Sequence, residues 1–94
     1  MRAKRIDSNQ GEIVKALRKL GATVFITSGV GNGFPDLVVG YKGKNILIEV
    51  KDGSKPPSAQ ALSIDEELFH EIWKGDAVII NSVDSAINLI EAIK

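Results

Sequence analysis

Two carboxylates and one amine in the middle of the chain are the side chains best suited to chemistry. Asp36 follows Pro35 and precedes an apolar run, and Glu49 and Lys51 end the next apolar run on either side of Val50. Carboxylate oxygens are the ligands that Mg²⁺ and Mn²⁺ prefer. A neighbouring ammonium group can orient a water molecule or stabilise charge on a phosphate. The pattern predicts metal-assisted hydrolysis of a phosphodiester, with Asp36, Glu49 and Lys51 as the catalytic set.

Two adjacent strands are needed to bring these side chains together. The segments 36–41 and 45–51 are rich in aliphatic residues and are joined by a short turn, so we expect an antiparallel hairpin. Glu49 and Lys51 are two residues apart and therefore point to one face of the sheet. The side chain of Val50 points the other way into the core, and its backbone carbonyl is expected to reach the metal beside Asp36 and Glu49.

Charged residues are disfavoured inside apolar strands, and such violations of the hydrophobic pattern are typical of functional sites. The alternative is that Glu49 and Lys51 lie at a solvent-exposed strand end and pair with each other. A further candidate ligand is Glu12, about one turn into an expected helix and close to its apolar stripe. Glu12 could reach the metal, although an acid in the first turn is also what the helix dipole favours.

The elements around the hairpin follow from periodicity and from turn residues. Helical spacing of apolar residues predicts a helix over 10–20 that ends at Gly21, and a β-branched segment predicts a strand over 22–27. Residues 28–33 include three glycines and predict a flexible loop, either a mobile loop that admits DNA or a plain strand connection. Two prolines, Pro56 and Pro57, prevent the hairpin's second strand from continuing.

The C-terminal third predicts a second helix, a strand and a last helix. Ser63 and Glu66 have the spacing of a capping box, and the helix that they open is expected to stop by Gly75. The apolar segment 76–81 reads as a central strand buried on both faces, and 83–93 as a helix. The predicted order is α-β-β-β-α-β-α, an α/β domain with a four-stranded mixed sheet flanked by helices.

Composition limits the classes of protein and of site. The 94 residues, 44% of them hydrophobic, suit one domain over 1–94. No apolar run is long enough to span a membrane, and the basic N-terminus is not followed by the apolar region of a secretory signal. The absence of cysteine and the single histidine exclude thiolate and multi-histidine metal sites, and fit a cytoplasmic protein.

Charge is distributed unevenly along the chain. Residues 1–55 carry ten Lys/Arg against five Asp/Glu, whereas residues 56–94 carry two against seven. Since three of the five N-terminal acids are the candidate ligands Glu12, Asp36 and Glu49, the rest of that surface is strongly basic. A basic surface of this kind favours a nucleic-acid partner over scattered solvated charges, and Lys55 is a candidate phosphate contact.

The same residues resemble a known nuclease family. Pro35-Asp36 followed by Glu49-Val50-Lys51 matches the motif of the PD-(D/E)XK superfamily. The Gly-rich segment before it and the Lys-Pro-Pro segment after it resemble the VRR-NUC (virus-type replication-repair nuclease) domain, in its short stand-alone bacteriophage form. The resemblance covers essentially the whole chain and implies a restriction-endonuclease-like fold.

The resemblance also implies roles for individual residues. Glu12 would be the acid on the first helix, Asp36 and Glu49 the metal-binding pair, and Lys51 the catalytic lysine. Gln60 lies slightly early for the glutamine that the family often carries near its next helix. The implied protein is a Mg²⁺-dependent DNA endonuclease, with Mn²⁺ as a possible substitute, acting as a homodimer on branched DNA such as Holliday junctions in the cytoplasm of the cell (the host's, if the chain is phage-encoded).

Two alternatives to a junction nuclease remain open from the sequence. One is a DNA-binding or assembly module that keeps the fold without turnover. The other is a nuclease acting on duplex ends, flaps or RNA.

Overall fold

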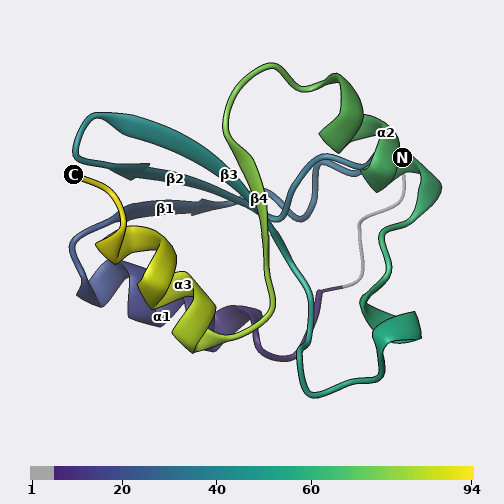
Figure 1. Ribbon diagram of the computed structural model, residues 1–94, viewed down its shortest axis with the longest axis horizontal. Coiled ribbons are helices and arrows are strands. Elements are labelled where there is room, and N and C mark those ends of the chain that lie inside the picture. The colour runs from purple at the N-terminus through teal and green to yellow at the C-terminus, as the bar shows by residue number, and fades with distance from the viewer. Residues whose placement is uncertain (1–5) are drawn as a thin grey trace.

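A four-stranded mixed sheet and three α-helices make up the part of the chain that the structure describes, residues 6–94 of a computed structural model (Figure 1). The elements are α1 (Gln10–Lys19), β1 (Thr23–Ile26), β2 (Leu37–Tyr41), β3 (Lys44–Val50), the 3₁₀ turn η1 (Pro57–Gln60), α2 (Ile64–Ile72), β4 (Ala77–Ile80) and α3 (Val83–Glu91). The predicted α/β class and the order of helices and strands are confirmed. The short η1 turn was not predicted.

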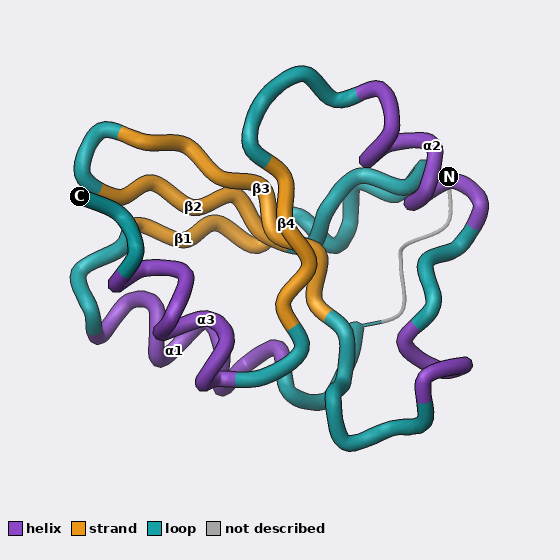
Figure 2. Tube along the Cα trace, viewed as in Figure 1, coloured by secondary structure: helices purple, strands orange, loops and turns teal. Residues whose placement is uncertain are grey.

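The strands lie in the order β1-β2-β3-β4. The first three are antiparallel, and β3 pairs with β4 in parallel. The connection between β2 and β3 is the expected hairpin, in which Lys42 and Gly43 both have positive φ, as its tight turn requires. Figure 2 shows the four strands side by side, with the hairpin at one end of the sheet and α2 at the other.

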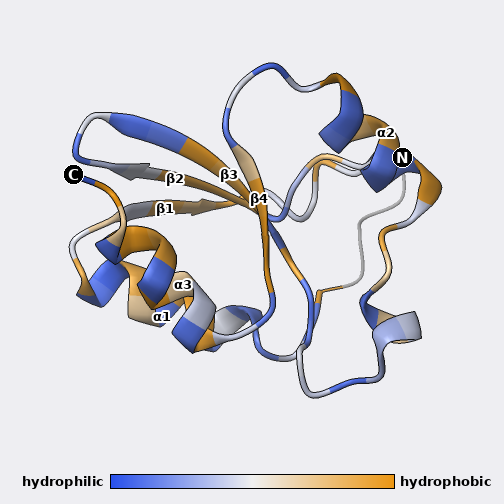
Figure 3. Cartoon of the chain, in the orientation of Figure 1, coloured by the Kyte–Doolittle hydropathy of each residue, from blue (hydrophilic) through white to orange (hydrophobic). Residues whose placement is uncertain are grey.

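The core lies between one face of the sheet and the pair α1 and α3 (Figure 1). Alternate residues of β3 enter it, namely Ile46, Ile48 and Val50, as a period of two requires. In Figure 3 the apolar colour gathers where α1 and α3 meet the sheet. The expected inward orientation of Val50 is confirmed, because this residue is 1% exposed.

The prediction that the last strand is central and buried on both faces was wrong. β4 is at the edge of the sheet, and Ile79 is 49% exposed on the face opposite the core. A continuous apolar run does not distinguish an edge strand from a central one, because β4 is too short to show alternation. Within residues 6–94 no helix is long and apolar enough to cross a membrane.

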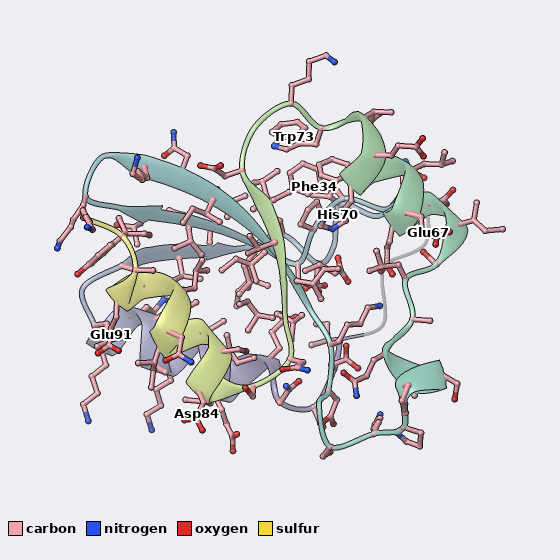
Figure 4. All side chains as sticks on the ribbon, viewed as in Figure 1. Phe34, Glu67, His70, Trp73, Asp84 and Glu91 are labelled. Carbon is pink, nitrogen blue, oxygen red and sulfur yellow. The ribbon has the colours of Figure 1, made fainter. Side chains whose placement is uncertain are left out.

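The segment from 28 to 34 is a strand connection that docks on α2. Gly33 has φ +82°, and a side chain there would place its Cβ 2.3 Å from the backbone oxygen of Asp65. Phe34 contacts Phe69 of α2 edge to face, and Phe69 stacks on Trp73. In Figure 4 the Phe34 and Trp73 side chains lie near α2. The close approach of two backbones explains why glycine stands at position 33.

We predict that Gly33→Ala destabilises the protein by about 2–4 kcal/mol, because it combines a strained backbone with a steric clash. Urea unfolding measures the change. Gly29→Ala is the matched control, since nothing lies within 4 Å of a Cβ at that position. Equal stability of the two variants would contradict the docking of this segment on α2.

Candidate active site

The candidate site lies where β2 and β3 end near α2. Asp36 immediately precedes β2, and Glu49 lies one residue before the end of β3. Both are buried, at 2% and 0% exposure. Burial of two carboxylates requires compensating hydrogen bonds or positive charge, so their surroundings decide what they can do.

The Asp36 carboxylate is fixed beside the backbone that follows Glu49. The amide of Val50 donates to Oδ2 of Asp36 at 2.8 Å. Leu47 and Lys51 donate their amides toward β4, so the amide and carbonyl of Val50, which lies between them, face β2. The sequence anticipated that Asp36 and β3 would meet, and the hydrogen bond to Val50 is the contact that joins them.

Pro35 ends the ladder between β2 and β3. Leu37 pairs with Ile48, so continuing the register brings Pro35 opposite Val50. Proline has no amide hydrogen and cannot donate to the Val50 carbonyl as a ladder residue would. The carbonyl of Pro35 accepts instead from the Thr27 hydroxyl at 2.8 Å. The local sequence thus keeps the expected ligand, the Val50 carbonyl, out of the β2–β3 ladder.

Glu49 and Lys51 face a cavity of about 320 Å³ beneath the start of α2, as their spacing predicted. Asp7, Ser63 and Glu66 also line this cavity. The Lys51 ammonium is 3.7 Å from Oε2 of Glu49 and 2.9 Å from Oε1 of Glu66. The alternative of a solvent-exposed strand end is wrong, because both side chains are largely buried, although the two groups do lie within ion-pair distance. Asp36 does not line this cavity.

Glu66 was missed as a member of the site. It is 5% exposed, the same oxygen that meets Lys51 accepts from the Ser63 amide at 2.9 Å, and the predicted capping box is confirmed. The capping-box spacing located Glu66 at the start of the helix. It could not show that this helix start packs over the end of β3, because that contact is long-range.

Gln10, and not Glu12, extends from α1 toward Asp36. The buried residues of α1 are Gln10, Ile13, Val14 and Leu17. This stripe leaves Glu12 exposed, facing a separate cavity of about 530 Å³ that Asp52 and Asp84 also line. The expectation that Glu12 joins Asp36 and Glu49 is corrected, because Glu12 lies on the exposed side of α1 and not on the face that packs on the sheet.

A buried chain of hydrogen bonds connects Gln10 to Asp36 through Ser28. The Gln10 amide donates to the Ser28 hydroxyl at 3.1 Å, and that hydroxyl donates to Oδ1 of Asp36 at 3.3 Å. Gln10 and Ser28 are 3% and 2% exposed. The helical period that includes Gln10 in the apolar stripe was the available signal for this residue. A neutral amide stands where the resemblance implied a carboxylate.

The two expected nucleic-acid contacts lie in the loop around η1. Lys55 is exposed, and its carbonyl accepts from the Gln60 side chain at 2.7 Å. The other end of the Gln60 carboxamide accepts from Asn81 at 3.3 Å. The carboxamide of Gln60 is thus held between its own loop and the segment after β4, whereas the Lys55 side chain is exposed.

Asp52 ties the segment after β3 to the start of the chain. Its carboxylate accepts from the hydroxyl and amide of Ser54 and from the Ser8 hydroxyl, and these bonds hold the pKa of Asp52 below its ordinary value. Asn9, next to Ser8, donates to the Lys51 carbonyl at 3.0 Å. Both contacts fix the backbone that carries Lys51.

The donor set fits a hard divalent cation, with one restriction. Asp36 and Glu49 offer carboxylate oxygens and Val50 a carbonyl, and Mg²⁺ keeps several waters when it binds so few protein ligands. Among residues 6–94 there is no group of three His, Cys, Asp or Glu side chains that could hold a metal ion. Any cation here would thus be held by two side chains, a backbone oxygen and water.

Comparison of the chain with protein-family models, with curated protein sequences and with solved structures gave no significant match. The resemblance to the VRR-NUC domain accordingly stays a prediction, and the geometry of the site carries the functional argument.

We predict that Ser28→Ala lowers the free energy of unfolding by about 1–3 kcal/mol, because it removes the hydroxyl that bridges two buried polar groups. Chemical denaturation measures the loss. The exposed Ser58→Ala is the control and should change stability by less than about 0.5 kcal/mol. If both variants unfold at the wild-type denaturant concentration, the Gln10–Ser28–Asp36 connection contributes nothing to the fold.

Proposed function

We propose that this protein is a metal-dependent phosphodiesterase that cuts DNA, with Asp36, Glu49 and Lys51 as its catalytic residues. One observation carries the proposal: an ammonium and a carboxylate from the end of β3 line the same cavity, and Asp36 is hydrogen-bonded to the residue between them. Two buried carboxylates, those of Glu49 and Glu66, lie 3.7 and 2.9 Å from the Lys51 ammonium.

The proposed reaction is the attack of a water molecule on phosphorus. The new P–O bond forms as the bond to the leaving sugar oxygen breaks, and that oxygen takes a proton from solvent. A divalent cation held by Asp36, Glu49 and the Val50 carbonyl would, when bound, neutralise phosphate charge and help a water molecule to ionise. The Lys51 ammonium would orient the attacking water or donate to a non-bridging phosphate oxygen.

DNA is proposed as the substrate because of the excess of basic residues in the first 55 positions. The site itself is acidic, so the phosphates of the bound strand need those cations outside it. The preference for branched DNA rests on the family resemblance alone, as does the restriction-endonuclease-like classification of the fold.

We predict that Asp36→Asn and Glu49→Gln each lower the rate of Mg²⁺-dependent DNA cleavage roughly 10²-fold or more. Both changes keep size and hydrogen-bonding shape while removing charge. Glu12→Gln is the matched control and should cut at the wild-type rate, because Glu12 faces another cavity. The assay uses labelled four-way junction, flap and linear duplex with Mg²⁺, Mn²⁺ or EDTA.

The outcomes of this panel separate the candidate functions. Full metal-dependent cleavage by both the Asp36 and Glu49 variants would remove the site assignment. Binding of DNA by the wild type without cleavage under either metal would favour a non-catalytic binding module. Cleavage of flaps or duplex ends in preference to junctions would replace branched DNA as the substrate.

A homodimer is proposed from the surface of α2. Ile64, Leu68 and Ile72 are spaced four residues apart and lie on one exposed stripe, at 75%, 51% and 68% exposure. An exposed apolar stripe on a small domain is typical of an interaction surface. Two copies would supply the two sites that cleavage of both strands of a branch needs.

We predict a solution molar mass of two chains, which Leu68→Glu shifts toward one chain by burying a charge in the interface. Sedimentation equilibrium measures both. Ile26→Glu is the control, because Ile26 is similarly exposed (55%) on β1. A wild-type mass of one chain would exclude the dimer.

A further inference from the structure

The attachment of α2 to the rest of the protein depends on a charged residue. Glu66 is the only buried residue of α2, while its apolar residues Ile64, Leu68 and Ile72 face outward. The first turn of α2 packs against the backbone of Gly33 and reaches the end of β3 through the ion pair between Glu66 and Lys51. Later in the helix, Phe69 contacts Phe34. A helix that buries a carboxylate in place of a leucine points to a role for that carboxylate beyond packing.

Lys51 has two acidic neighbours at unequal distances. Its ammonium is 2.9 Å from Glu66 and 3.7 Å from Glu49. The shorter contact is a charge-assisted hydrogen bond, whereas the longer one is an electrostatic contact without hydrogen-bond length. The side chain of Lys51 is 12% exposed, so water provides little competition for either contact. The position of the ammonium is therefore a balance between two carboxylates from different elements.

We propose that Glu66 is a positioning residue that holds the Lys51 ammonium by a hydrogen bond and so keeps it from closing to hydrogen-bond distance on Glu49. The capping box makes Glu66 suited to this role. Oε1 of Glu66 accepts from both the Ser63 amide and the Lys51 ammonium, so the start of α2 fixes the oxygen to which Lys51 binds. Without the Glu66 charge, the nearest carboxylate to Lys51 is Glu49, and the two would close into a direct pair.

As a statement about cleavage, this role rests on the proposed metal-dependent activity; as a statement about Lys51, it can be tested without any metal. Glu66→Gln removes the charge but keeps an oxygen that can accept from the Ser63 amide, because glutamine also serves in capping boxes. Ser63→Ala removes the hydroxyl of the cap and leaves the charge. Glu67→Gln is a matched control, since Glu67 is the next residue and is exposed.

The first measurement is the ¹H–¹⁵N NMR signal of the Lys51 ammonium in the metal-free protein, assigned by its loss in Lys51→Arg. In Glu66→Gln we expect this signal to shift or disappear, while Ser63→Ala and Glu67→Gln keep it at its wild-type position. An unchanged Lys51 signal in folded Glu66→Gln overturns the proposal. If Glu66→Gln does not fold, the same shift must appear in Glu66→Asp, whose shorter side chain retracts the charge, and its absence there overturns the proposal equally.

The second measurement is the Mg²⁺ concentration that gives half-maximal cleavage. We expect Glu66→Gln to raise it roughly tenfold or more, because Lys51 then competes with the cation for Glu49. A merely structural role would lower the amount of active protein without moving this midpoint. A Lys51 signal that depends on Glu66 in a protein that cuts no DNA would remove the proposed function but leave the positioning role. If the protein cuts DNA but Glu66→Gln changes neither the Mg²⁺ midpoint nor the Lys51 signal, the positioning role is removed and the proposed function remains.

Discussion

The hydrogen bond from the Val50 amide to the Asp36 carboxylate is the contact on which the candidate site depends. It lies where Pro35 stops the pairing of β2 with β3, and it replaces a ladder bond with a bond to a side chain. The Asp36 carboxylate thereby takes the place of a backbone acceptor at the end of the sheet. The Glu49 and Lys51 side chains then take their places by simple alternation along β3, on the face opposite the core. A shift of one residue in this register would exchange the buried Val50 with its charged neighbours.

The site therefore combines three kinds of support with different strengths. The sheet and the α1–α3 pair form the apolar core and fix the backbone of β3. Polar chains, Gln10–Ser28–Asp36 and Asn9–Lys51, connect the start of α1 to the two ends of the motif. α2, by contrast, is held through charge and through aromatic contacts near the sheet's end. Buried polar groups of this kind are costly unless every partner is present, which ties the geometry of the site to the integrity of the fold.

Much of the fold followed from local patterns in the sequence. Helical spacing with Gly21, the hairpin turn at Lys42-Gly43 and the capping box at Ser63 each gave an element and one of its ends. The edge position of β4 and the η1 turn did not follow, because strand order is a long-range property and short turns carry little periodic signal. At the site, alternation along β3 gave Glu49, Val50 and Lys51 their correct faces. Glu12 was placed wrongly and Gln10 overlooked because residue type was given more weight than the position of each residue on the helix.

The central claim is that a divalent cation binds at the end of β3 between Asp36 and Glu49. Paramagnetic broadening of backbone amide NMR signals by Mn²⁺, added well below the protein concentration, tests this claim without reference to catalysis. Broadening centred on Asp36, Glu49 and Val50, and lost in Glu49→Gln, is the result that the geometry predicts. Broadening centred instead on the cavity beside Glu12, Asp52 and Asp84, or spread over the surface without a centre, would contradict it.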